Sequence, residues 1–137
     1  MSTVEVGLVS YLTGYAGLTA LVSTRVYPFM IPQGATLPCV TYQRIDTPRS
    51  LTHGDSGATG TLARPRFQFS CWAATLSSAQ AIAYQLRAAL NGKTGSIGTA
   101  PSAVTVRAIL VDNEMVDFDP GTELYRVIAD YLVWQEE

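Results

Sequence analysis

The chain has 137 residues, of which 47% are hydrophobic and 15% are charged, and its formal net charge is −2 at pH 7. This length and apolar content predict a single folded domain over residues 1–137, and they exclude a largely disordered chain. The slightly acidic balance argues against a protein that binds nucleic acid by neutralising phosphates. No basic segment precedes the first apolar residues and no apolar run approaches about 20 residues, so neither a signal peptide nor a membrane span is expected.

Residues 4–23 have the apolar spacing of a helix. Ser2 and Glu5 have the spacing of a capping box, in which two side chains satisfy backbone donors at a helix start. Gly14 and Gly17 interrupt the pattern. We therefore expect one helix here, or two helices joined at a glycine.

The next segment begins with three prolines, Pro28, Pro32 and Pro38, which exclude a continuous helix because each lacks a backbone donor. Residues 39–46 follow and carry β-branched and aromatic side chains. Their composition predicts the first long strand, although its alternation is imperfect.

Residues 47–65 are dominated by Gly, Ser and Thr. Polar segments of this length are uncommon inside compact domains, so this one predicts a long, flexible hairpin arm. His53, the only histidine, lies in the arm. A general base needs a fixed position and a partner, and the sequence gives His53 neither, which favours a solvated loop histidine.

A strand followed by a helix over residues 66–92 is the expected nucleus of the domain. Apolar and polar side chains alternate from Arg66 to Ala73, as in a strand with one buried face. Ser77 and Gln80 have capping-box spacing, and Gly92 supplies the left-handed residue that often ends a helix. Between them runs an apolar stripe of Ala79, Ile82, Ala83, Leu86 and Leu90.

Two further strands are predicted in the last third of the chain. Residues 104–111 alternate as a third strand, and residues 123–135 form a fourth. Residues 112–122 between them predict an acidic hairpin loop, in which Pro120 and Gly121 suit a type II turn.

The fourth strand carries large apolar side chains on both of its faces. Ile128, Leu132 and Trp134 lie opposite the face that starts at Tyr125, and Trp72 interrupts the polar face of the second strand in the same way. A half-buried strand of a monomer should be polar on one side. We therefore expect one face of the sheet to meet the helices and the other to meet another subunit.

Together these elements predict an α+β domain. Its sheet would be four-stranded and mainly antiparallel, in the order first, second, fourth, third. The N-terminal helix and the central helix would pack on one face, and the long β-hairpin arm would extend from the sheet.

The sequence holds no recognisable catalytic or metal-binding constellation. Cys39 and Cys71 are expected to be buried thiols that act as small hydrophobes, and two cysteines with one distant histidine cannot form a zinc site. The acidic segment over residues 112–122 lacks a glycine at the sixth position of an EF-hand loop, so a solvated hairpin is favoured over a bound ion. With no nucleophile elbow, phosphate loop or dinucleotide motif, we expect a protein that is not an enzyme and has no cofactor.

Opposite charges fall in different parts of the chain. Acidic residues such as Asp117 and Asp119 gather near the C-terminus, whereas Arg49 and Arg64 flank the arm. This distribution suits a head-to-tail contact between subunits, and chance segregation in a short chain explains it equally well.

Four stretches, taken in order, resemble the tail-completion proteins of long-tailed bacteriophages. The resemblance covers nearly the whole chain, and its one departure is Cys39, where the family pattern usually has an aromatic or apolar residue. The stretches are RVYP at 25–28, PQGATLPCVTYQRI at 32–45, the Trp72 strand leading into AQAIAYQLRAALNG at 79–92, and YRVIADYLVW at 125–134.

The resemblance implies a tail terminator, also called a tail-to-head joining protein. Such proteins are structural virion proteins that assemble in the host bacterial cytoplasm and end up at the head–tail interface. They form a homo-hexameric ring on the tail tube, stop polymerisation of the major tail tube protein and present a surface to a head-completion connector. DNA would at most pass through the lumen of the ring, and no membrane would be a partner.

Within this hypothesis, the charged and apolar residues have expected interface roles. The candidates for the interface are Trp72, Ile128, Leu132, Trp134, Arg49, Arg64, Asp117 and Asp119. Two alternatives stay open: a head-side stopper or adaptor, and a dimeric ferredoxin-like ligand-binding module. The second alternative requires a concave pocket with convergent polar groups.

Overall fold

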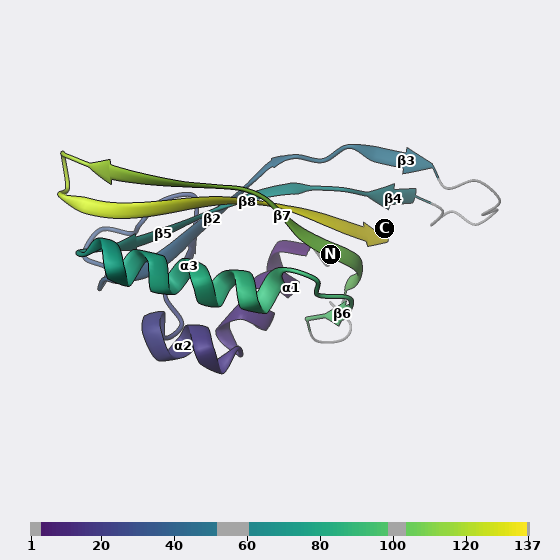
Figure 1. Ribbon diagram of the computed structural model, residues 1–137. Helices are drawn as coiled ribbons and strands as arrows, with labels where there is room; N and C mark the ends of the chain where they lie inside the picture. Colours follow the sequence, from purple (N-terminus) through teal and green to yellow (C-terminus); the bar gives the residue numbers. More distant parts are fainter. Residues whose placement is uncertain (1–3, 52–60, 99–103, 137) are drawn as a thin grey trace.

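In the computed structural model, helices cover one face of a single eight-stranded sheet and leave the other face open (Figure 1). The structure describes residues 4–51, 61–98 and 104–136. The helices in these residues are α1 (Val4–Thr13), α2 (Ala16–Val22) and α3 (Leu76–Leu90). The strands are β1 (Val26–Pro28), β2 (Cys39–Asp46), β3 (Arg49–Leu51), β4 (Thr61–Ala63), β5 (Arg66–Ala73), β6 (Gly95–Ile97), β7 (Val104–Asp119) and β8 (Leu124–Glu136).

The four predicted strands lie in the sheet as β2, β5, β8 and β7, joined by antiparallel ladders. The predicted α+β class and strand order are therefore confirmed. The four-stranded sheet is wrong, because β1, β3, β4 and β6 belong to it as well. Each of these four has only three residues, which is too few for a period-two pattern to stand out in the sequence. β1 is also parallel to β2. Parallel strands are not joined by a tight hairpin turn, so no turn motif in the sequence indicated this pairing.

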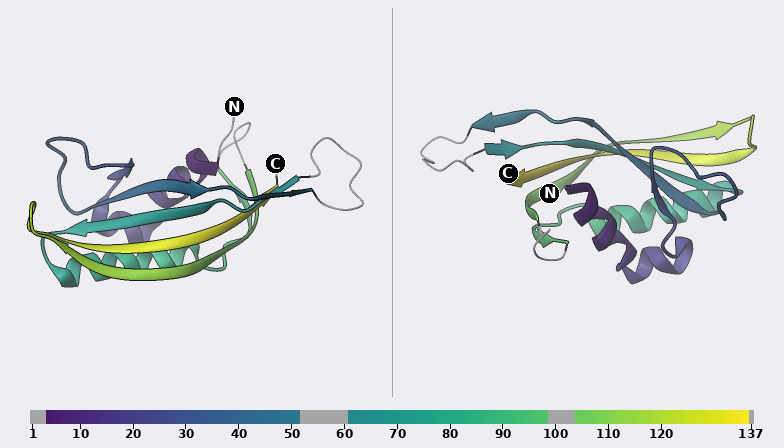
Figure 2. Two further views of the ribbon diagram at one scale, coloured as in Figure 1. Left: turned by 90° about the horizontal axis from the view of Figure 1, so that it is seen from above. Right: turned by 180° about the vertical axis from the view of Figure 1, so that it is seen from behind.

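The β3–β4 hairpin extends β2 and β5 beyond the body of the sheet (Figures 1 and 2). Pro48 and Pro65 lie at the two joins, where a missing backbone donor interrupts a ladder. The strands stay connected there, since Arg64 N donates to Pro48 O and Val133 N donates to Pro65 O. The base of the arm is thus a paired hairpin that also contacts the end of β8. The flexibility expected for residues 47–65 stays a prediction, and residues 52–60, including His53, lie outside the described residues.

Two helices, α1 and α2, form the N-terminal segment, which is the second of the two alternatives that the glycine pattern left open. They meet at an angle of 81° across the break at Gly14 and Tyr15. Ser2 lies outside the described residues, so the capping box stays a prediction, and Glu5 forms an ion pair with Arg44 of β2 at 2.6 Å. No single described helix is long and apolar enough to cross a membrane, although α1 and α2 reach the required length and composition when counted together.

The central helix is capped two residues earlier than predicted. The side chain of Thr75 caps α3 by accepting a hydrogen bond from Ser78 N at 3.2 Å, so the proposed box of Ser77 and Gln80 is wrong. Thr75 and Ser77 are both residue types that are preferred at a helix N-cap. The path of the chain as it leaves β5 selects Thr75. Gly92 has a φ of 85°, which confirms its predicted left-handed conformation.

The core lies between the covered face of the sheet and the three helices. Phe69 is at its centre, with its ring 5.6 Å from that of Tyr131 in an edge-on arrangement and 6.4 Å from that of Phe67. The whole predicted stripe of α3 is buried against these strands. Leu8 and Leu18 extend the core beneath α1 and α2.

The β7–β8 hairpin is longer than the sequence suggested. β7 continues to Asp119, so residues 112–119 are strand rather than loop, and the turn occupies only residues 120–123. Cross-strand pairing with β8 stabilises this polar segment along its length. The type II turn is also wrong, because the left-handed residue is Glu123, with a φ of 58°, and not Gly121.

Glu123 is strained for a residue with a side chain, since the left-handed region favours glycine. We predict that Glu123→Gly stabilises the fold by about 0.5–1 kcal/mol, the strain relieved exceeding the added entropy of the unfolded chain. Urea unfolding of the two proteins measures this change. Glu123→Ala keeps the strain and should bring no gain. An equal gain from alanine would show that the side chain of Glu123, rather than its backbone, limits stability.

Candidate interaction surface

The outer face of the sheet is the face that no helix covers (Figures 1 and 2). We use this name for the outward-pointing side chains of β5, β7 and β8. Four of them are the apolar residues singled out from the sequence: Trp72, Ile128, Leu132 and Trp134. All four are half-buried, and the structure brings them onto one continuous surface. Opposite them in β5 and β8, the alternate side chains point into the core, as expected.

Two residues of β7 complete this apolar surface and were missed in the sequence. Met115 pairs with Ile128 and is 53% exposed, and Leu110 pairs with Leu132 and is 46% exposed. Met115 was assigned to a loop. An unbroken alternation would place Leu110 on the same face as Val106, but the strand irregularity between Val106 and Ala108 puts the two on opposite faces. Exposed apolar side chains gathered on one face typically mark a contact with another molecule.

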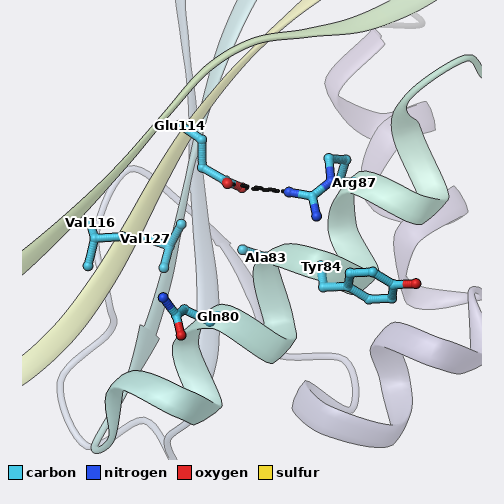
Figure 3. Close-up of a pocket in the computed structure, with 7 residues that line it drawn as sticks. All are labelled: Gln80, Ala83, Tyr84, Arg87, Glu114, Val116 and Val127. Carbon is cyan, nitrogen blue, oxygen red and sulfur yellow. Dashed lines mark hydrogen bonds and ion pairs between the residues drawn. The ribbon is translucent and has the colours of Figure 1, made fainter.

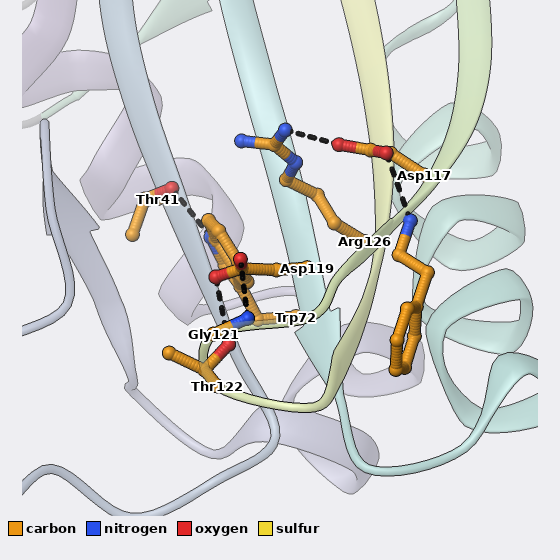
Figure 4. A network of polar contacts seen from close by, with 8 residues as sticks. Thr41, Trp72, Asp117, Asp119, Gly121, Thr122 and Arg126 are labelled. Carbon is orange, nitrogen blue, oxygen red and sulfur yellow. Dashed lines mark hydrogen bonds and ion pairs between the residues drawn. The ribbon is translucent and has the colours of Figure 1, made fainter.

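A polar network surrounds Trp72 at one end of the outer face (Figure 4). The indole nitrogen of Trp72 donates to Thr41 Oγ1 at 3.0 Å, and the guanidinium of Arg126 lies 4.9 Å from the centre of the indole ring. Arg126 also forms an ion pair with Asp117 across the β7–β8 ladder. The indole is therefore fixed on its edge and on its face, so Trp72 is oriented before any partner binds.

The ion pair with Arg126 holds the pKa of Asp117 below its ordinary value of 3.8, with a smaller contribution from the backbone N–H of Phe118. Because the pKa is lower in the folded state, this pair stabilises the fold above that ordinary value and the contribution is lost as the pH falls below it. Asp119 has a different role: its carboxylate accepts hydrogen bonds from Gly121 N and Thr122 Oγ1 and so shapes the turn.

We predict that Asp117→Asn lowers the urea midpoint at neutral pH and that its difference from the parent chain narrows as the pH falls below 3.8, because the parent carboxylate is then progressively protonated. Arg126→Gln should show the same narrowing, and the double variant should lose little more than either single one. A difference that stays constant with pH would mean that Asp117 acts through its shape and not through its charge.

A second polar cluster lies further along the same face. Arg66 binds Asp112 at 2.6 Å and approaches Asp130 at 3.6 Å, and Asp130 also accepts from Gln68 at 3.3 Å. The hydrogen bond that Arg66 donates to Asp112 is the main cause of a raised pKa at Arg66. Acidic residues near the C-terminus thus pair with arginines of their own chain. This pairing weakens the interpretation that their charge is reserved for a neighbouring subunit.

Of the two arginines predicted at the arm, only Arg64 has a described side-chain contact. The guanidinium of Arg64 lies 5.8 Å from the ring centre of Trp134, a cation–π distance that joins the arm to the outer face. Arg49 is in β3, where its backbone pairs with that of Ala63, and its side chain lies outside the described residues.

A groove of about 240 Å³ lies on the covered side of the sheet, between α3 and the stretch of β7 that contains Glu114 and Val116 (Figure 3). Ala83 and Val127 form its floor, and Tyr84 and Val116 form its two rims. An ion pair of 3.2 Å between Arg87 and Glu114 crosses one end. The groove contains no cluster of unpaired polar groups, and its apolar rims suit a side chain better than a polar small molecule.

The two cysteines are free and buried. They lie on opposite faces of the β2–β5 pair, since Cys39 is opposite Trp72 whereas Cys71 is opposite Val40, and a disulfide between them is geometrically excluded. Burial raises the pKa of the Cys39 thiol to about 11, while nearby Arg25 opposes the shift. Within the described residues, no three His, Cys, Asp or Glu side chains gather as they would around a metal ion.

Comparison with known proteins relates the chain to a protein family and to solved structures. The model of a family described as tail completion protein gp17 matches residues 6–136. Among solved structures, a chain of the virion of a native gene transfer agent particle superposes with a TM-score of 0.71 and 21% sequence identity, covering 92% of this chain and 89% of that chain. At this identity the structural likeness concerns the fold alone. No curated protein matches the sequence at a significant level.

Proposed function

Because the chain belongs to the tail completion protein gp17 family, and is accordingly a structural protein of the virion tail, we propose that it forms a ring that caps the tail tube. In this role it ends polymerisation of the tube protein and joins the tail to the head. The observation that carries the proposal is the outer face, whose half-buried and exposed apolar side chains are not covered by any of the described helices.

The outer face suits a protein contact because it is rich in apolar side chains and because its Trp72 side chain has a fixed conformation. Trp72 is held by Thr41 and Arg126, so little side-chain freedom is lost when a partner covers it. Met115 and Leu110 supply exposed apolar area beside it. Ion pairs at two places along the face satisfy its charges internally, so a partner can cover the arginines without leaving them unpaired. We assign this face to contact with another subunit.

The proposed mechanism is the geometry of assembly. A head-to-tail contact uses two different surfaces of one subunit, and it produces a closed ring when successive rotations add up to a full turn. Such a ring, six-membered in our proposal, offers one side to the tail tube and the other to a head-completion connector. The β3–β4 hairpin projects beyond the body of the sheet, which suits it to reach a neighbouring subunit or the tube.

Two measurements test this function. Light scattering over a concentration series should reveal reversible passage from a monomer of 14.7 kDa to a ring. Addition of the chain to polymerising tail tube protein should then shorten the tubes seen by electron microscopy. Tubes of unchanged length would contradict tube termination, and co-sedimentation with filled heads instead of tails would favour the head-side connector. A dimer whose mass does not change with concentration would contradict the ring.

A further inference from the structure

The loop after β1 exposes two large apolar side chains that the outer face does not include. Met30 is 73% exposed and Phe29 is 71% exposed, more than any other large hydrophobic residue in the described part of the chain. The backbone holds them in place: Phe29 has a φ of 64° and its N–H donates to Tyr42 O at 2.7 Å. Arg25 closes the base of the loop by donating to Pro38 O at 2.8 Å. We call Phe29 and Met30 the knob.

The groove between α3 and β7 is a site that such a knob can fill. Its rims, Tyr84 and Val116, are 60% and 55% exposed, so burying them removes apolar area from water. Its only charged lining groups, Arg87 and Glu114, neutralise each other. An uncharged, apolar insert can therefore enter without stranding a buried charge.

Knob and groove lie on opposite sides of the same molecule. The knob follows β1, at one edge of the sheet, and the groove lies beneath β7, on the other side of β8. Seen from above, the loop and the β7–β8 hairpin are at the same end of the strands but at opposite edges (Figure 2). The sheet between them prevents contact within one chain. Two copies placed side by side in the same orientation would bring the knob of one to the groove of the next.

The charges around the two features are complementary. The loop over residues 29–38 has no charged residue, and the cation nearest its base is Arg25. The turn beyond the groove carries Asp119 and Glu123. An arginine beside the knob would thus face carboxylates beside the groove, which fixes the orientation of two copies as well as attracting them.

We propose that the knob of one copy inserts into the groove of the next and forms a head-to-tail contact between subunits. This inference rests on the proposed ring and names one contact that builds it. Because knob and groove are different surfaces, the contact is heterologous and can repeat from copy to copy.

Cysteine cross-linking tests the contact. The full chain carrying both Met30→Cys and Val116→Cys is treated with a short bifunctional maleimide at the concentration where light scattering detects assembly. We expect a ladder of linked species that ends at the ring size. Each single variant should give no ladder, and an equal mixture of the two should stop at a linked pair. The buried native thiols Cys39 and Cys71 should not react.

A matched control pairs Met30→Cys with Ala81→Cys, which is exposed on the solvent side of α3, and should give no ladder. A ladder of equal yield from this control, or none from the test pair, overturns the inference. Rings without the Met30–Val116 link would leave the proposed function standing, whereas the absence of rings would count against that function as well.

Discussion

Replacing Phe69 by alanine is expected to destabilise the folded chain by about 3–5 kcal/mol, the range for removing a fully buried aromatic side chain. Phe69 is 1% exposed and contacts Tyr42, Phe67 and Tyr131 on three strands, so its loss leaves a cavity where the sheet meets α3. The free energy of unfolding of an ordinary domain is about 5–15 kcal/mol, so the variant would lose a large share of its stability.

Urea unfolding followed by circular dichroism measures this effect. The chain offers a matched control in Phe29→Ala, which deletes the same atoms from a position that is 71% exposed. We expect this control to change the stability of the monomer by less than about 0.5 kcal/mol. A loss below about 1 kcal/mol for Phe69→Ala would mean that the core rearranges to fill the space and that the aromatic cluster is not its centre.

Met115→Glu is expected to weaken self-assembly at least about tenfold, which corresponds to about 1.4 kcal/mol. Met115 is 53% exposed on the outer face and pairs with Ile128, so a carboxylate there remains in water in the monomer. In an assembly that covers the face, the same carboxylate would be buried without a partner, beside Asp117. The variant should therefore fold normally and assemble poorly.

Light scattering across a concentration series, combined with urea unfolding, separates these two effects. Ala81→Glu places the same charge on an exposed position of α3, away from the outer face, and should leave both assembly and stability unchanged. Normal assembly of Met115→Glu would place the outer face outside the subunit contact. Unfolding of the variant would instead identify Met115 as part of the core.

Much of the fold could be predicted because its signals are local and repeated. The alternation around Phe67 and Phe69 identified β5, and the stripe through Ile82 and Leu86 identified α3. Both patterns extend over several residues, so one exception does not hide them. The strand order followed from connection rules applied to the four long strands, and the ladders agree with it.

The candidate surface could be predicted in part. Trp72 and Trp134 were found because large aromatics stood on a strand face where polar residues were expected. Met115 was missed because its segment was expected to be a loop, and Leu110 was missed because a strand irregularity changes which side of β7 it faces. A bulge depends on how two strands pair, and one strand read by itself contains little sign of it.

The sequence by itself determined the α+β class, the four long strands with their order, and the presence of apolar residues on both faces of the sheet. The class, the strands and their two apolar faces follow from the period of each element, which is a property of neighbouring residues, and the strand order follows from connection rules. Tertiary structure decided the cap at Thr75, the extent of β7, the left-handed Glu123, and the meeting of Arg126 with Trp72 and Asp117. In each case several local conformations have similar energy. A contact with another part of the chain, made in the folded sheet, then selects one of them.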